Sequence, residues 1–329
     1  MSDPSAAKNA PAPDVDDLAS GFEEHRPMLM GHCYRMLGSL AEADDAVQET
    51  LLRAYRARES FEGRSSLKTW LHRIATRVCL DMLGDRMRRE RPIDLGPPSD
   101  TDAPLIELPA DRWVEPMPDA LVLGGADPAE RAERKQQIRL AYVAALQHLP
   151  ARQRAALLLT EVIGWSAAEA AELLDMTVAA VNSALQRARA TLASRDFGAA
   201  PGELSGEQAG LVDRFVEAFE RYDMDALTAL LREDAAMCMP PYSLWLRGPA
   251  HIADWMLGRG AACRGSRLVP TAANGAPAFG QYKPDPAGGP HKPWSLVVLD
   301  LDGDRIGGLT FFLDTARFFP RFGLPPELP

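Results

Sequence analysis

The side chains with the clearest chemistry lie between residues 164 and 192. Asn182, Gln186, Arg187 and Arg189 fall at helical spacing among aliphatic residues. Amide side chains both donate to and accept from the edges of bases, and guanidinium groups donate to bases and phosphates. The set therefore predicts a polar helix surface that reads duplex DNA. An ordinary two-helix corner of an α-helical domain is the alternative.

A helix-turn-helix must position these side chains. Ser166 and Glu169 stand three residues apart, which is the spacing of a capping box at the start of a helix. Asp175 to Thr177 interrupts that helix, and the Thr177 side chain can cap the one that follows. A short helix, a tight turn and a second helix with a polar face suit a major groove. The apolar face of the second helix contains Val178, Val181, Leu185 and Leu192.

A second polar surface is predicted on a helix that follows Ser39. Ser39 and Glu42 have capping-box spacing. The residues that then recur at intervals of three and four, and so predict a buried face, are Ala43, Ala46, Val47, Thr50, Leu51, Ala54 and Tyr55. The opposite face is mostly acidic. A solvated helix face is the simplest reading, and an acidic docking surface for a basic partner is the alternative. The residues on that face are Glu42, Asp44, Asp45, Gln48, Glu49 and Arg53.

The next stretch concentrates positive charge. Between Arg64 and Arg91 there are eight lysines and arginines against three acids, Asp81, Asp85 and Glu90. Such a local excess suits a phosphate backbone. Aromatic residues in a basic setting can also hold unstacked bases. Taken singly, Trp70 is more typical of a core residue.

The bulk composition describes a large chain with an acidic balance. Its 329 residues exceed one typical domain, and its formal net charge is −10, so basic surfaces must be segregated. Four scattered cysteines show no metal-ligand spacing, which predicts reduced thiols in a cytoplasmic protein without a metal or cofactor. No apolar run is long enough to cross a bilayer and no signal-peptide core is present, so we expect no membrane association.

Two changes of composition divide the chain. Residues 92–130 are rich in proline and carry nine acids against one base, Arg112, which predicts a long acidic linker. Two interpretations of this linker remain open: a solvated tether, or a segment that lies in a positively charged channel. From Ser205 two helices precede several strand-like runs, separated by turns such as Asn274-Gly275. This order predicts an α+β domain whose curved sheet encloses a pocket.

Three stretches in this order, 34–57, 61–89 and 149–192, resemble the extracytoplasmic-function group of bacterial sigma factors, the promoter-recognition subunits of RNA polymerase. The resemblance implies two all-α domains, of which the second is a helix-turn-helix. The expected parts are a disordered N-terminus at 1–20, a first sigma domain at 21–91, the linker at 92–130, a second sigma domain at 131–196 and a further domain at 205–329.

The resemblance also implies partners and roles. The partners are promoter DNA and core RNA polymerase, through its β′ clamp and β flap. The linker would run through the RNA-exit region. Docking on the clamp would use Asp44, Asp45, Gln48, Glu49 and Arg53. Opening of the minus-ten element would use Arg64, Ser65, Ser66, Lys68, Trp70, Arg73 and Arg77. Reading of the minus-thirty-five element would use Thr177, Ala180, Asn182, Ser183, Gln186, Arg187 and Arg189.

The C-terminal part, 205–329, resembles the SnoaL-like group of the NTF2-like α+β cone fold, through the order of its stretches rather than one motif. The resemblance implies a non-catalytic domain that modulates the sigma factor in cis, with an unidentified small molecule as a candidate ligand. Its expected pocket residues are Tyr242, Trp245, His251, Trp255 and Tyr282, with Asp254 and Trp294 as further candidates.

Two other functions fit parts of the pattern. A stand-alone, ligand-responsive helix-turn-helix regulator would bind operator DNA without polymerase, and it leaves residues 34–89 without a role. A DNA-tethered SnoaL-like cyclase or isomerase would turn over a small substrate through His251 or Asp254. No His/Asp pair stands at a spacing that identifies a catalytic dyad. Association with core polymerase separates the sigma factor from both alternatives.

Overall fold

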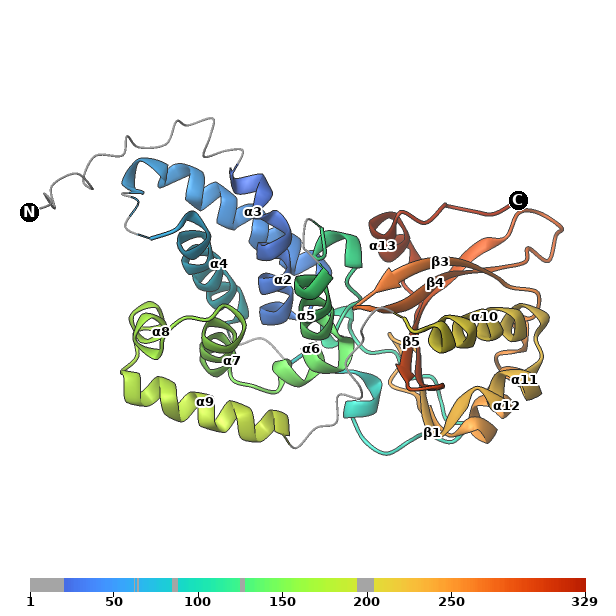
Figure 1. Cartoon of the computed structure of the whole chain (residues 1–329). Helices are drawn as coiled ribbons and strands as arrows, with labels where there is room; N and C mark the ends of the chain where they lie inside the picture. Colours follow the sequence, from blue (N-terminus) through green and yellow to red (C-terminus); the bar gives the residue numbers. More distant parts are fainter. Residues whose placement is uncertain (1–20, 62, 64, 85–87, 125–127, 194–203) are drawn as a thin grey trace, which may run out of the picture.

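The computed structural model describes residues 21–61, 63, 65–84, 88–124, 128–193 and 204–329. A helical half contains the two predicted sigma domains, and a sheet with its own helices forms the other half (Figure 1). The N-terminus predicted to be disordered, at 1–20, lies outside the described residues. None of the helices that are described is long and apolar enough to span a membrane.

Three helices form the first helical unit. Ser39 caps the second of them by accepting from the Glu42 backbone N–H at 3.2 Å, so the predicted start is confirmed. The reciprocal half of the capping box is absent, because the Glu42 carboxylate pairs with Arg89 instead. Ser66 caps the third helix by accepting from Thr69 N. The helices are α2 (Arg26–Leu37), α3 (Leu40–Arg56) and α4 (Leu67–Leu83).

The second helical unit contains the predicted helix-turn-helix. The capping box of Ser166 and Glu169 is complete, and Thr177 caps the second helix by accepting from Ala180 N at 3.1 Å. Asp175 adopts a left-handed conformation, with φ of 51°, which turns the chain between the two helices. The unit comprises α5 (Pro128–Ile138), α6 (Leu140–Gln147), α7 (Ala151–Leu157) with a π turn at Leu158–Val162, α8 (Ala167–Leu174) and α9 (Val178–Ala193).

The apolar pattern from Asp127 to Leu146 predicts a single helix that ends before Pro150, but the structure has two. Helix α5 ends at Ile138 and α6 begins at Leu140. Arg139 between them is extended, with ψ of 137°. Its guanidinium pairs with Asp300 at 2.8 Å, and the Ile138 carbonyl accepts from Asn274. The C-terminal domain therefore occupies the Ile138 carbonyl, which would accept a main-chain hydrogen bond in a continuous helix, and it also pairs with the Arg139 side chain.

The two helical units share one hydrophobic core, which runs from Phe22 to Ala188. At its centre Arg154 of α7 is 4% exposed and donates to three backbone carbonyls, including that of Met36 in α2. Gln147 of α6 donates to the Arg35 carbonyl at 3.2 Å. Burial lowers the pKa of Arg154 to about 10, and these carbonyls hold its charge. The free chain therefore packs the two units directly against each other.

The C-terminal domain has the predicted α+β architecture. Three helices, α10 (Gly206–Arg221), α11 (Met224–Ala229) and α12 (Pro249–Leu257), accompany an open six-stranded mixed sheet. All of its neighbouring strands are antiparallel except β1 and β6. The sheet order is β2 (Trp245–Arg247), β1 (Leu231–Cys238), β6 (Arg305–Phe312), β5 (Lys292–Asp302), β4 (Ala276–Lys283) and β3 (Arg267–Ala273).

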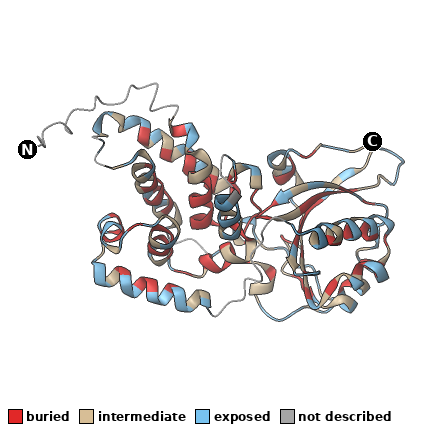
Figure 2. Cartoon of the chain, viewed as in Figure 1, coloured by how far each residue is buried: buried red, intermediate tan, exposed pale blue. Residues whose placement is uncertain are grey.

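Both faces of this sheet are covered. One face packs on α10 to α12 around Phe215, Phe219 and Phe279. The other face carries Tyr282 and Phe312, which pack on the C-terminal helices α13 (Thr315–Phe318) and η7 (Phe319–Phe322). Buried segments meet where the helical half and the sheet touch (Figure 2). The junction between the two halves is therefore a packed interface.

The segment between the helical units, residues 88–124, is irregular as predicted but is not a solvated tether. Trp113, Val114 and Met117 are buried. Main-chain hydrogen bonds join the segment to the C-terminal domain, such as Ser243 N to the Ile106 carbonyl at 2.9 Å. The tether interpretation is therefore wrong for the free chain. Its seven prolines and its acids gave no sign of these contacts, because the contacts form with residues more than 100 positions away.

Candidate nucleic-acid and polymerase interfaces

The outer face of α9 presents the predicted polar stripe. Asn182, Ser183, Gln186 and Arg187 are exposed, while Val181, Ala184, Leu185 and Ala188 are buried against the core. Ala180 is half-buried, and the Thr177 hydroxyl is occupied by its capping bond. Two amides and a guanidinium are therefore exposed on one face of α9, and their contact with bases in a major groove stays a prediction.

Two residues of α9 need separate comment, Val178 for its exposure and Arg189 for its partner within the chain. Val178, predicted for the apolar face, is 45% exposed at the first turn of the helix. An exposed aliphatic group there suits contact with a thymine methyl. The sequence pattern did not predict this role, because a valine at helical spacing is normally assigned to the buried face. Arg189 is exposed, but its guanidinium pairs with Glu161 at 2.6 Å. Because this pair lies at the surface, a phosphate can replace Glu161 at little cost.

Helix α4 and the residues just before it hold the second group of predicted DNA contacts. Lys68 and Arg77 are exposed, Ser65 is half-buried and Ser66 serves as the helix cap. Trp70 is half-buried and its ring lies 5.0 Å from that of Phe61, so it is part of the core edge as well as a candidate stacking surface. Arg64 lies outside the described residues.

Arg73 connects the two surfaces that are predicted to contact DNA. Its guanidinium lies 3.1 Å from the Glu172 carboxylate of α8 and 5.6 Å from the Trp165 ring centroid. Arg73 thus faces the helix-turn-helix of the same chain. Contact of Arg73 with DNA requires the two helical units to separate at this point.

The predicted docking face of α3 is exposed in part. Asp45 and Gln48 are exposed, and Arg53 pairs with Glu49 at 2.7 Å and with Asp81 at 3.0 Å. Asp44 is instead held by the C-terminal domain, because Arg321 of η7 lies 2.7 Å from its carboxylate. One polar contact expected for polymerase is therefore already occupied within the chain.

Sequence reasoning missed two apolar residues on this face. Leu52 and Tyr55 are 43% and 48% exposed, although the periodicity placed Tyr55 with the buried residues. They follow Asp45 and Gln48 along one helix surface, at positions 45, 48, 52 and 55. An apolar centre with a polar rim is typical of a protein–protein interface. Helical spacing along α3 could have predicted that Leu52 and Tyr55 are exposed, because Thr50 and Ala54 already complete the buried face of this helix.

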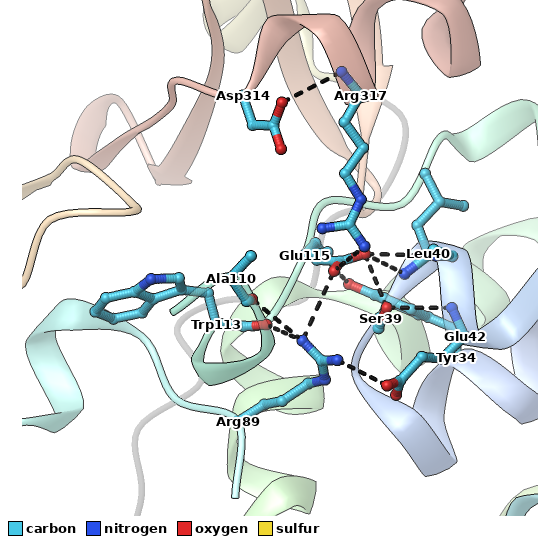
Figure 3. Close-up of polar contacts among 11 residues, drawn as sticks. Tyr34, Ser39, Leu40, Glu42, Arg89, Ala110, Trp113, Glu115, Asp314 and Arg317 are labelled. Carbon is cyan, nitrogen blue, oxygen red and sulfur yellow. Dashed lines mark hydrogen bonds and ion pairs between the residues drawn. The ribbon is translucent and has the colours of Figure 1, made fainter. Parts of the chain in front are cut away.

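Glu115 joins three parts of the molecule (Figure 3). Its buried carboxylate accepts from Ser39 Oγ at 2.9 Å and from Leu40 N at 2.8 Å, at the first turn of α3. Negative charge at a helix N-terminus is favourable. The same carboxylate pairs with Arg317 of α13 at 2.6 Å, and Arg89 approaches it at 3.7 Å. A single charge of the connecting segment thereby links α3 to the C-terminal domain.

Asn274 forms a second junction at the tip of the β3–β4 hairpin. The predicted Asn-Gly turn is confirmed, with φ of 57° and 74° at its two residues. The Asn274 side chain accepts from Met117 N and donates to Tyr34 Oη and the Ile138 carbonyl, all within 2.9 Å. Burial raises the pKa of Tyr34, whose hydroxyl donates to the Glu115 carbonyl. The hairpin tip therefore bonds to both helical units and to the segment between them.

The five candidate pocket residues of the C-terminal domain are not brought together. Trp255 packs on the helix-covered face of the sheet, whereas Tyr282 packs on the opposite face. His251 is exposed, and its ring bonds only to the Arg247 carbonyl among the described residues. Trp245 is buried and donates to the Gly96 carbonyl. Tyr242 lines a separate cavity of about 350 Å³ beside the connecting segment. These five residues therefore do not line one pocket, since strand β4 turns Tyr282 to the face of the sheet that α10, α11 and α12 do not cover.

Sequence comparisons assign both helical units. Residues 22–89 match the model of Sigma-70 region 2, and residues 139–192 match that of Sigma-70 region 4. The chain is 45% identical over 320 residues to the ECF RNA polymerase sigma factor SigG of Mycobacterium tuberculosis, covering 95% of this chain and 85% of that protein. It is 27% identical over 218 residues to a probable ECF sigma factor, SigI, of the same species, covering 66% of this chain and 67% of SigI.

Structural comparison extends the likeness to the whole chain. The crystal structure of the M. tuberculosis extracytoplasmic function sigma factor SigJ superposes with a TM-score of 0.60. It covers 93% of this chain and 99% of the SigJ chain at 22% identity. The C-terminal sheet domain is thus part of a fold that a solved structure shares.

Proposed function

The chain belongs to the extracytoplasmic-function (ECF) RNA polymerase sigma factors, and from this premise we propose how its surfaces divide the work of promoter-specific initiation. As a member of that family it binds core RNA polymerase and promoter DNA. The exposed stripe of α3, with Asp45, Gln48, Leu52 and Tyr55, docks on the clamp of the β′ subunit. Charge and apolar area on one helix face support this assignment.

The two DNA-facing surfaces read separate promoter elements. Asn182, Gln186 and Arg187 on α9 contact base edges of the minus-thirty-five element, while the body of region 4 contacts the β flap. Helix α4, with Lys68 in its first turn and Arg77 further along, contacts the melted minus-ten element. We assign residues 21–91 and 131–196 to these two domains. A stand-alone regulator or a tethered enzyme leaves the α3 and α4 surfaces without a role.

The C-terminal domain, 205–329, acts as a non-catalytic modulator in cis. The observation that carries this proposal is the Glu115 junction, where one carboxylate bonds to α3 and to Arg317 of α13. Arg321 holds Asp44 of the same docking helix. Core polymerase must therefore compete with the C-terminal domain for α3. The connecting segment must also leave the sheet before it can enter the polymerase channel.

Reconstitution with core polymerase tests the specificity assignment. Promoters are first identified by sequencing the transcripts that the holoenzyme starts. Arg187→Ala should then lower run-off transcription from these promoters about tenfold, since a base or phosphate contact of arginine is worth about 1–3 kcal/mol. Arg214→Ala removes an equal charge from exposed α10 and should change nothing. A chain that fails to bind core polymerase in a pull-down contradicts the family function itself.

A second prediction concerns the Asp44–Arg321 pair. Arg321→Ala should raise the affinity for core polymerase about two- to threefold, because an exposed ion pair contributes up to about 1 kcal/mol. The gain should shrink at high salt as the pair is screened. Arg221→Ala, which breaks a surface pair with Glu217, is the matched control. Fluorescence anisotropy with labelled chain measures both, and equal affinities of wild type and Arg321→Ala would exclude this competition.

A further inference from the structure

A cavity of about 190 Å³ lies between the two helical units, and Lys68, one of the candidate minus-ten contacts, is among its lining residues. Gly31 and Arg35 of α2, with Lys68 and His72 of α4, form one wall. Arg134 and Gln137 of α5, with the apolar end of the π turn, form the other. The volume is below the usual range for drug-sized ligands and suits a small ion.

Arg35 is a buried cation in the lining of this cavity. The residue is 6% exposed, and its Nε has no hydrogen-bond partner among the described residues, although Tyr142 and Glu133 lie near enough to favour its charged form. Arg154 is equally buried, yet it donates to several carbonyls. A buried charge of this kind is normally paired, since its desolvation is costly. Burial lowers the pKa of Arg35 to about 10, which still leaves it charged at neutral pH.

The remaining lining completes a set of donors. Lys68 is exposed, and Arg134 and Gln137 bring further N–H groups from α5, some of which already donate to the Val122 carbonyl and to nearby glutamates. The two acids of the lining, Glu130 and Glu133, are exposed and bonded to Arg134 and Gln137 respectively. His72 is buried, which lowers its pKa to about 4, so its ring is neutral. Its Nδ1–H donates to the Lys68 carbonyl, which leaves Nε2 able to accept a hydrogen bond from a ligand hydroxyl.

We propose that this cavity is a binding site for a small tetrahedral oxyanion of the phosphate type, with Arg35 as its principal ligand. Cationic and amide donors reach the cavity from three helices, α2, α4 and α5, which favours a tetrahedral anion over a planar carboxylate. Gly31 keeps the wall open, because a Cβ there would lie 3.3 Å from Arg35 Nη1. An anion bound here bridges α2 and α4 of region 2 to α5 of the second unit. It therefore stabilises the packed form of the free chain.

Thermal unfolding and titration calorimetry with inorganic phosphate test the site. At constant ionic strength and pH 7, phosphate should raise the Tm of the full chain saturably relative to chloride. Sulfate should act similarly and acetate much less. Arg35→Met should lower phosphate affinity at least about tenfold, since a charge-assisted pair is lost. Arg152→Met, which removes an exposed arginine of α7, should bind phosphate as the wild type does.

A second variant keeps the test independent of core packing. Lys68→Met alters an exposed side chain of the cavity lining, and it should weaken phosphate binding about threefold without changing the fold. Circular dichroism reports whether each variant folds. The proposal is overturned if phosphate gives no saturable response, if acetate matches phosphate, or if folded Arg35→Met retains wild-type affinity. None of these outcomes bears on polymerase binding, so the sigma-factor assignment is tested separately.

Discussion

Glu115→Gln should destabilise the packed form of the free chain by about 3 kcal/mol, because removal of one partner from a buried charge cluster leaves the others uncompensated. Arg89 and Arg317 would lose their shared anion, and the first turn of α3 would lose a negative charge at its N-terminus. The glutamine keeps the shape of the side chain. The loss therefore reports charge rather than packing.

Urea unfolding and hydrogen exchange measure this effect. Amides of α13 and of the first turn of α3 should exchange faster in Glu115→Gln, because both elements depend on the same carboxylate. Glu107→Gln is the matched control, since Glu107 is exposed on the same segment. In run-off transcription with limiting core polymerase, Glu115→Gln should also be more active than the wild type. Unchanged exchange in both elements would show that the junction contributes little.

Asn274→Ala should have a comparable effect, about 3 kcal/mol, through three lost side-chain hydrogen bonds at a buried site. The Met117 N–H and the Tyr34 hydroxyl would lose partners in the interior. Asn274 also has a φ of 57°, a conformation that alanine adopts poorly. Both causes act in the same direction, so a second variant must separate them.

Asn274→Gly provides that separation. Glycine accepts the positive φ without strain but cannot make the side-chain bonds. We expect it to lose most of the stability that alanine loses, as measured by urea unfolding followed through tryptophan fluorescence. Gly303→Ala, at an exposed turn with φ of 59° and open space around it, measures the backbone strain alone. If Asn274→Gly is as stable as the wild type, the side-chain bonds do not hold the domains together.

Much of the local structure followed from the sequence, because the interactions that start helices and turns span only a few residues. Ser166 caps Glu169 N three positions on, and the Asn274-Gly275 turn joins adjacent strands. The α+β class of the C-terminal domain and the helix-turn-helix were predicted in this way. The roles of the α3, α4 and α9 surfaces came from the family resemblance, and they stay predictions residue by residue.

The failures of prediction have a common cause in long-range contacts. The helix predicted between 127 and 147 is divided in two, because Asp300 pairs with the Arg139 guanidinium and Asn274 donates to the Ile138 carbonyl. Tyr282 turned away from Trp255 because strand register, rather than residue type, decides which face a side chain joins. Tyr55 and Val178 are exposed because each helix had already filled its core face with other residues. Each outcome depends on partners that sequence periodicity does not identify.

The sequence by itself determined which segments form helices, turns and strands and which family the chain resembles, since those depend on local spacing and on motifs. Only the tertiary structure placed the acidic segment on the C-terminal sheet and brought Glu115 between α3 and Arg317. Only the tertiary structure buried Arg35 beside an open cavity. The physical reason is that a charge or amide acquires its role from the groups that surround it after folding, and those groups lie far away in the chain.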